Sequence, residues 1–205
     1  GIQCDPVNRA VEGICGQPGQ AFGPGQPRRV SLSWRRLGRV FGPEGHPCVN
    51  ARVLGTPTDT GVLNRTQVPT ALIMADRIRL YFSSRAPSGH SFPLFVDVSR
   101  TDPTQVLGVS EAPVMAPGAM GAFDEDGVMP SVVLRHDGRL LLYYTGWNAK
   151  VSTPYHNAIG LAESVDGGVS FERCFAGPVM DRTPEEPYLA VTPTVLIEDG
   201  VWRCW

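Results

Sequence analysis

The chain has 205 residues and a formal net charge of −2. Its 23 glycines and 19 prolines make up about a fifth of the sequence, against roughly 12% in an average protein. In a helix interior a glycine costs roughly 1 kcal/mol and a proline roughly 3 kcal/mol, so this composition excludes a helix-rich fold. The charge balance predicts no nucleic-acid partner, and the lack of an apolar run of roughly 20 residues predicts no membrane partner.

The N-terminal segment, residues 1–33, is predicted to be an irregular arm. Its first 30 residues include six glycines and four prolines, with few apolar residues and no periodicity. Such a composition does not supply a buried core. Residues 34–205 are the predicted folded domain, which begins with a short strand expected at 39–41.

Three similar segments follow, with starts near residues 66, 127 and 190. Each contains a proline, a serine or threonine, a β-branched run, a tight turn and an aromatic-ended second strand. The prolines are Pro69, Pro130 and Pro193. The Asp-Gly turns at 137–138 and 199–200 favour two-residue hairpins, because type I′ geometry needs positive φ at both central residues.

Each of the first two repeats has room for two more strands. The expected segments are 92–98 and 105–109 in the first repeat and 157–162 and 171–175 in the second. Four antiparallel strands per repeat are typical of a β-propeller blade. The predicted fold is therefore an all-β propeller, of which the chain holds about 2.3 to 3 blades. We expect such a piece to be inactive, and aggregation-prone or oligomeric, on its own, because open blade faces and strand edges associate.

The cysteines and histidines indicate no metal site. The five cysteines are scattered, and neither they nor the four histidines have the spacing of metal ligands. The sequence therefore predicts no metal and no cofactor. Thiols without a CxxC pair are typical of a reducing compartment, so the predicted localisation is cytoplasmic.

Residues 164–171 fit the pattern Ser-x-Asp-x-Gly-x-Ser/Thr-aromatic, the Asp-box of sialidase-type propellers. Asp166 is predicted to accept hydrogen bonds from backbone amides of its own turn, and Gly168 to adopt a left-handed conformation. Phe171 is expected to pack beneath the blade. The motif predicts a structural turn and no catalytic group.

Acidic clusters precede the second and third repeats. Their members are Asp124, Glu125, Asp126, Asp181, Glu185 and Glu186. Because the innermost strands of a propeller line its central channel, equivalent positions bring carboxylates of two blades to one pocket. Two such carboxylates can act as acid and base, or as nucleophile, on a glycosidic bond. The alternative is that they are solvated loop residues.

Four segments carry a resemblance to a known superfamily. They are 121–131 (GAFDEDGVMPS), 143–148 (YYTGWN), 157–164 (NAIGLAES) and 185–188 (EEPY). They resemble the five-bladed β-propeller glycoside hydrolases, which include the arabinanase and β-xylosidase family 43 and the invertase and levansucrase group, and above all an uncharacterised bacterial branch. The resemblance covers residues 34–205. It implies a parent of five four-stranded blades and roughly 300 residues.

Members of this superfamily use an aspartate of blade one as base or nucleophile, an aspartate of blade two to orient and tune, and a glutamate of blade three as general acid. The resemblance implies that Asp124 or Asp126 is the blade-two acid and that Glu185 or Glu186 is the general acid. The blade-one acid has no counterpart, because Gln67 stands beside the first repeat's proline. A different base, a pair of Asp124 and Asp126 in both roles, or a chain without activity would each fit.

The resemblance thus implies a hydrolase that cleaves a furanose or pentose glycoside and takes an oligo- or polysaccharide as its partner. The predicted sugar contacts are Gln67, Arg85, Trp147 and Tyr188. One alternative is a carbohydrate-binding propeller without catalysis, which the missing blade-one acid favours. Another is a sialidase-like propeller, which the Asp-box favours and the lack of a Phe-Arg-Ile-Pro start opposes.

Overall fold

The computed structural model describes residues 2–3, 35–36, 38–42 and 65–205. The predicted arm, 1–33, lies outside the described residues except for strand β1 (Ile2–Gln3), which pairs antiparallel with β2 (Arg35–Arg36). The short strand expected at 39–41 is wrong, because residues 38–42 have no strand conformation. The ring centroid of Phe41 instead lies 5.5 Å from that of Phe82, so Phe41 contributes a side-chain contact and no backbone strand pairing.

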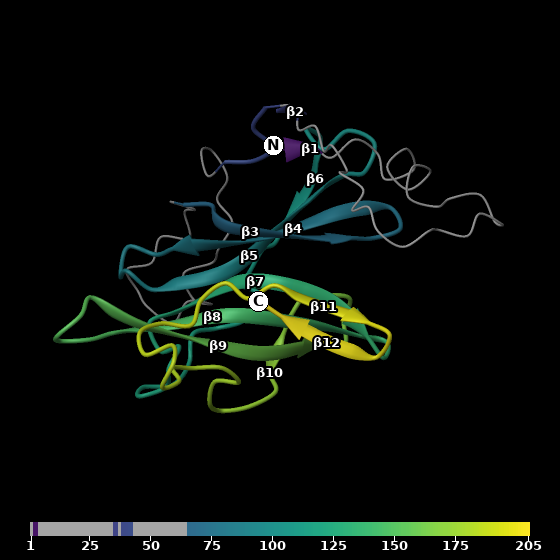
Figure 1. The fold of residues 1–205 in the computed structure, drawn as a ribbon. Helices are drawn as coiled ribbons and strands as arrows, with labels where there is room; N and C mark the ends of the chain where they lie inside the picture. The colour runs from purple at the N-terminus through teal and green to yellow at the C-terminus, as the bar shows by residue number, and fades with distance from the viewer. Residues whose placement is uncertain (1, 4–34, 37, 43–64) are drawn as a thin grey trace. The chain divides into compact units, whose positions relative to one another are not determined.

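The first repeat folds into a four-stranded antiparallel sheet in which each strand pairs with the next, here called the first meander (Figure 1). Its strands are β3 (Gln67–Ile73), β4 (Arg77–Arg85), β5 (Ser91–Ser99) and β6 (Val106–Val109). The strands expected in this repeat are confirmed. Their β-branched and aromatic residues suit a pleated, half-buried surface.

The second repeat forms an equivalent second meander. Its strands are β7 (Gly127–His136), β8 (Arg139–Ala149), β9 (Tyr155–Ser164) and β10 (Glu172–Arg173). Asp137 and Gly138 join β7 to β8 with φ of 47° and 77°. Both values are positive, so the Asp-Gly sequence adopts the two-residue turn that its composition predicts.

The third repeat contributes a hairpin that forms a sheet of its own. Strand β11 (Val195–Glu198) pairs with β12 (Val201–Cys204). Its turn residues, Asp199 and Gly200, have φ of 53° and 74°. The described residues contain no helix, and the all-β class is confirmed.

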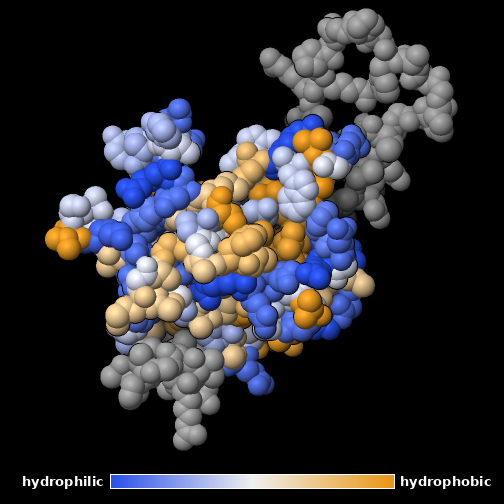
Figure 2. All heavy atoms as spheres, turned by 90° about the horizontal axis from the view of Figure 1, so that it is seen from below, coloured by the Kyte–Doolittle hydropathy of each residue, from blue (hydrophilic) through white to orange (hydrophobic). Residues whose placement is uncertain are grey.

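Side chains hold the two meanders together more than backbone pairing does. One residue pair, Ser91 with Gly127, joins β5 to β7 in parallel, and β3 lies beside β7. The core cluster contains Tyr81 from the first meander, Leu142 and Tyr144 from the second meander, and Phe171, which directly precedes β10. Figure 2 shows hydrophobic and hydrophilic residues interspersed over one face, as on most protein surfaces.

The turn at residues 164–171 has the local contacts expected from its sequence. The Asp166 carboxylate accepts the amide hydrogens of Val169 (2.9 Å) and Ser170 (3.0 Å) and the hydroxyl of Ser170 (2.6 Å). Gly168 has φ of 85°, and Phe171 is buried. Hydrogen bonds to one carboxylate, that of Asp166, therefore stabilise this turn.

The same turn clamps the second meander onto the first. The Tyr81 hydroxyl of β4 donates to the carbonyl of Gly168 (2.8 Å), and Arg79 donates to the carbonyl of Gly167 (3.3 Å). Arg79 is held by an ion pair to buried Asp97 (2.7 Å). Burial raises the pKa of Tyr81 to about 12, so its hydroxyl stays protonated and available as a donor. We call these contacts the turn clamp.

Replacing Asp166 with asparagine is expected to lower the melting temperature near pH 7, because an amide cannot accept all the hydrogen bonds that the carboxylate accepts. Burial acts to raise the pKa of Asp166, but the hydrogen bonds from Ser170, Ser164 and Val169 outweigh it and hold the pKa well below its ordinary value of 3.8. The stability that the carboxylate supplies is therefore complete above that value and is lost as the pH falls through the lowered pKa.

Melting curves of Asp166→Asn and the unchanged protein between pH 7 and pH 3 test this expectation. The difference in melting temperature should shrink as the pH falls below the ordinary carboxyl pKa. The matched control is Asp199→Asn, at an exposed turn with positive φ that asparagine tolerates, and it should show no difference. A difference for Asp166→Asn that stays constant across this range would contradict the argument.

Candidate functional site

Three of the predicted site residues, Arg85, Asp126 and Trp147, lie at one end of the two meanders. In an antiparallel meander the odd strands begin where the even strands end, so the starts of β5, β7 and β9 lie near the ends of β4 and β8. Arg85 ends β4, Asp126 directly precedes β7, and Trp147 lies near the end of β8 opposite Gly127. The fold thus gathers residues that are far apart in the sequence.

Asp126 is fixed by hydrogen bonds and still reaches solvent. Its Oδ2 accepts the amide hydrogen of Ala149 (2.6 Å), and its Oδ1 lies 3.4 Å from Nε2 of His90. The backbone carbonyl of Asp126 accepts the amide hydrogen of Ser91 (3.0 Å), which ties β5 to the start of β7. With its side chain 25% exposed, Asp126 has the placement of a group that can meet a ligand.

Trp147 and Arg85 lie at the same end of the sheet, where the Trp147 carbonyl accepts the backbone amide hydrogen of Asp126 (3.2 Å). The indole Nε1 donates to the Ser91 hydroxyl (2.5 Å), and the Arg85 guanidinium lies 5.1 Å from the centroid of the Trp147 ring. The Nε of Arg85 and the hydroxyl of Ser84 are buried without a hydrogen-bond partner among the described residues. Such unsatisfied donors are uncommon in folded proteins, and they leave this end of β4 with unused hydrogen-bonding capacity.

Gly127 is required where the two meanders meet. A Cβ at this position would collide with the Ser91 hydroxyl and with the indole nitrogen of Trp147. The close approach that lets Trp147 reach Ser91 thus depends on the absence of a side chain.

Gln67 is exposed at the start of β3, opposite Ser83. The next residue, Val68, has φ of 46°, and Thr192 before the third repeat's proline has φ of 44°. Left-handed conformations of β-branched residues are strained, and such strain persists only where the surroundings impose it. The first and third repeats therefore each have a strained residue at the same position, directly before the proline.

Asp124 lies in the core. Its side chain is 1% exposed, its Oδ2 pairs with the Arg173 guanidinium (2.6 Å), and it accepts the hydroxyl hydrogen of Tyr144 (3.1 Å). Burial, followed by the charge of Asp124, raises the pKa of Tyr144 and keeps that hydroxyl protonated. Asp124 and Asp126, two residues apart, thus face different surroundings, and only Asp126 reaches the surface end.

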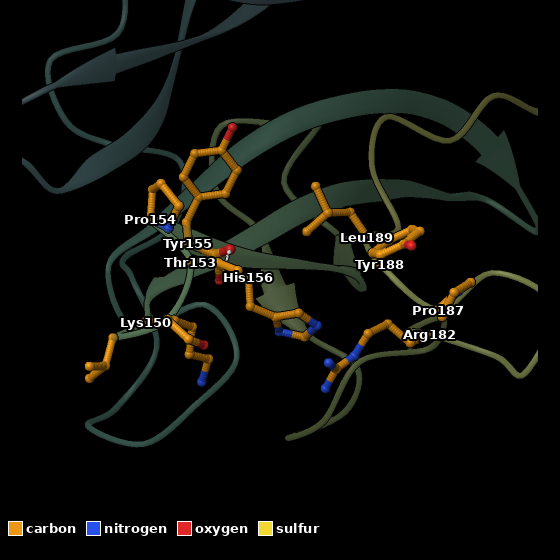
Figure 3. Close-up of a pocket in the computed structure, with 11 residues that line it drawn as sticks. Lys150, Thr153, Pro154, Tyr155, His156, Arg182, Pro187, Tyr188 and Leu189 are labelled. Carbon is orange, nitrogen blue, oxygen red and sulfur yellow. Dashed lines mark hydrogen bonds between the residues drawn. The ribbon is translucent and has the colours of Figure 1, made fainter.

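A cavity of about 640 Å³ opens beside the loop that follows Ala149 (Figure 3). Residues 150–156, from the β8–β9 loop and the start of β9, form one wall, and Arg182 with residues 187–189 form the other. His156 Nε2 lies 2.9 Å from Oδ1 of Asp181, and the Ala190 amide donates to the Asn157 carbonyl (3.4 Å). These contacts tether the second wall to β9. We call this cavity the loop pocket.

Tyr188 lines the loop pocket and is 82% exposed, but Glu185 and Glu186 do not line it. Both glutamates lie in an exposed turn, where their amides donate to the Thr183 hydroxyl (3.2 and 3.0 Å). The structure therefore brings Arg85, Asp126 and Trp147 together and leaves Glu185 and Glu186 on a separate surface turn.

His90 and the two cationic residues of the loop pocket, Lys150 in one wall and Arg182 in the other, were not predicted from the sequence. His90 comes to Asp126 from the loop before β5, and no spacing in the sequence signals that meeting. Lys150 and Arg182 carry no motif. Within the described ranges, no group of three or more His, Cys, Asp or Glu side chains is arranged to hold a metal ion. The same residues include no helix long and apolar enough to cross a membrane.

No family model matches the chain. Two uncharacterized proteins of Mycobacterium tuberculosis, from strains CDC 1551 and H37Rv, are each 34% identical to it over 174 residues. The match covers 85% of this chain and 54% of each relative. The chain therefore spans about half the length of these relatives.

Solved structures show the same fold at low sequence identity. A family 117 glycoside hydrolase from the marine bacterium Zobellia galactanivorans matches with a TM-score of 0.53 and 19% identity, over 84% of this chain and 48% of that one. A second glycoside hydrolase matches with a TM-score of 0.55 and 14% identity, over 80% and 50%. The chain has a glycoside-hydrolase-like fold.

The same fold also supports other chemistry on sugars. An N-acetylgalactosamine deacetylase from F. plautii matches with a TM-score of 0.50 and 17% identity, over 68% of this chain and 40% of that one. At these identities the similarity concerns the fold, because one fold carries many activities.

Proposed function

We propose that the chain is part of a five-bladed propeller glycoside hydrolase that cleaves a furanose or pentose glycoside. The observation that carries this proposal is the cluster of Asp126, His90, Arg85 and Trp147 at the shared end of the two meanders. Asp126 is a partly exposed carboxylate at the same end of the sheets as the Trp147 ring and the Arg85 guanidinium, and such a set of groups suits the binding and cleavage of a sugar. The two consecutive four-stranded meanders support the propeller reading, and the greater length of the relatives supports a parent with further blades.

In this proposal Asp126 is the blade-two carboxylate and acts as base or orienting group. Asp124 supports the site from the core through its pair with Arg173. Glu185 or Glu186 is the general acid, which requires that the rest of the protein enclose the turn and raise the pKa of that carboxyl. Gln67, Arg85, Trp147 and Tyr188 contact the sugar.

We expect Asp126→Asn to lower kcat on a susceptible aryl furanoside or pyranoside about 10²–10⁴-fold, because an amide cannot accept a proton. The variant keeps an acceptor for the Ala149 amide, so its melting temperature should stay near that of the unchanged protein. The assay uses the full-length protein and a panel of aryl glycosides. Asp199→Asn, at an exposed turn, is the matched control and should keep full activity.

Glu185→Gln and Glu186→Gln, made separately, test the general acid. One of them should lose activity on substrates with a poor leaving group and keep more of it on activated aryl glycosides. Full activity in both variants would remove these residues from the mechanism, and full activity of Asp126→Asn would remove the carboxylate on which the proposal rests.

A carbohydrate-binding propeller without catalysis is the second candidate. The presence of Gln67 where a blade-one acid is expected favours it, as does the exposure of Glu185 and Glu186. Calorimetry with arabinan, xylan and fructan oligosaccharides separates the two functions, because binding without turnover indicates the second.

A further inference from the structure

We propose that the loop pocket is a subsite for an acidic sugar residue, such as a uronic acid, whose carboxylate is bound by Lys150 and Arg182. This inference rests on the proposed function, since it names the substrate class of the same end of the fold. The loop pocket adjoins that site directly: Ala149, whose amide holds Asp126, is followed by Lys150 in the pocket wall.

The charge of the pocket favours an anion. Lys150 and Arg182 line it, and no aspartate or glutamate does. Lys150 is the only lysine of the chain. Within the described part of the protein no acidic group pairs with its ammonium, so the charge remains available.

Among the described residues Asp181 is the carboxylate that pairs with one of these cations, Arg182, and its Oδ1 also has two other contacts. Its Oδ1 lies 2.9 Å from Nε2 of His156 and accepts the backbone amide hydrogen of Arg182 (2.7 Å). The Nε of Arg182 lies 3.9 Å from the same oxygen, and the Arg182 side chain is 56% exposed. The other two guanidinium nitrogens have no partner in the described part of the chain and can bind a carboxylate in the two-point geometry that arginine favours.

The shape and lining of the pocket suit a sugar ring. Its volume of about 640 Å³ lies within the range of roughly 300–1,000 Å³ that is usual for ligand sites. Tyr155 and Tyr188 contribute aromatic side chains that carry both an apolar face and a hydroxyl. In Figure 3 the His156 ring and the Arg182 side chain point toward the same space between β9 and the 182–189 segment. A ring that packs against Tyr188 can place an anionic substituent near Arg182, whereas Tyr155 points to the other side of β9.

The test compares two probes that differ in charge alone. Calorimetry on the full-length protein measures binding of an oligogalacturonide and of the same oligosaccharide with its carboxylates reduced to alcohols. We expect the acidic probe to bind about tenfold more tightly or better, which is the usual size of a charge-assisted hydrogen bond. Its affinity should fall as salt is raised, whereas the neutral probe's affinity should not.

Two variants locate the effect. Arg182→Gln and Lys150→Gln should each remove most of the preference for the acidic probe and leave binding of the neutral probe unchanged. The matched control, Arg203→Gln, removes an exposed arginine that pairs with Glu198 and should keep the preference. Equal affinity for the two probes, no binding of either, or a preference that survives both variants would overturn the inference. Competition by inorganic phosphate at the affinity of the sugar acid would also overturn it, because it would indicate a site for small anions.

Failure of this inference and failure of the proposed function give different results. Asp126→Asn should abolish cleavage and leave binding of the acidic probe intact. A protein that prefers the acidic probe but cleaves no glycoside supports the subsite and contradicts the hydrolase. A protein that cleaves glycosides without any preference for the acidic probe supports the hydrolase and contradicts the subsite.

Discussion

Arg173→Met is expected to lower the free energy of unfolding by about 3 kcal/mol, at the lower end of the range for breaking a buried ion pair because Arg173 is partly exposed. The variant leaves the Asp124 carboxylate buried with the Tyr144 hydroxyl as its remaining side-chain partner. An unpaired buried charge is costly, so this loss exceeds the contribution of one ordinary hydrogen bond. Urea denaturation of the full-length protein at neutral pH measures it.

The double variant Asp124→Asn with Arg173→Met removes the charge together with its partner, so it should be more stable than Arg173→Met alone. The same variants also separate the two possible roles of Asp124. A structural Asp124 predicts that Asp124→Asn loses stability and keeps most of its activity per folded molecule. A loss of kcat at unchanged stability would instead make Asp124 a catalytic residue, and a loss below about 1 kcal/mol for Arg173→Met would contradict the buried-pair argument.

Gly168→Ala is expected to be the most damaging substitution in the turn clamp, with a loss of about 2–5 kcal/mol in the free energy of unfolding. The left-handed backbone of Gly168, with φ of 85°, accounts for about 1–2 kcal/mol of this. The added Cβ would also collide with the Tyr81 hydroxyl and lie 3.0 Å from Leu140, and overpacking of this kind costs about 1–3 kcal/mol.

Two comparisons separate the collision from the backbone strain. Gly167→Ala is the matched control, because Gly167 has φ of 76° with nothing near its Cβ position, so it should lose only the strain contribution. In a Tyr81→Phe background the colliding oxygen is absent, and Gly168→Ala should then cost less than in the unchanged protein. Equal losses in the two backgrounds would mean that Tyr81 does not contact this turn.

The hairpins could be predicted from sequence because their signals are local. The Asp-Gly turns at 137–138 and 199–200 adopt positive φ, and the β-branched and aromatic residues beside them favour strands. The lengths of the strands were harder to predict from the sequence. Strand β4 continues to Arg85 because its ladder with β5 extends to Ser91, and no residue near the end of β4 signals that pairing.

The candidate site could be predicted only in part, because its geometry depends on distant packing. The register of β7 against β8 shifts between Pro130 and Val132, and this irregularity brings Gly127 opposite Trp147. A sequence does not reveal such a shift. The burial of Asp124 depends on Arg173, 49 residues further along the chain, so the acidic run from which it comes looks uniform although its members differ.

The turn clamp also sets when the fold can be completed during synthesis. Each hairpin consists of local contacts and can form as soon as its strands have left the ribosome. Tyr81, however, receives its partner Gly168 only 87 residues later in the chain. At typical synthesis rates of about 5–20 residues per second, this delay lasts roughly 4–17 s. During that interval the apolar face of the nascent first meander is uncovered, which makes it the segment that we expect chaperones to bind.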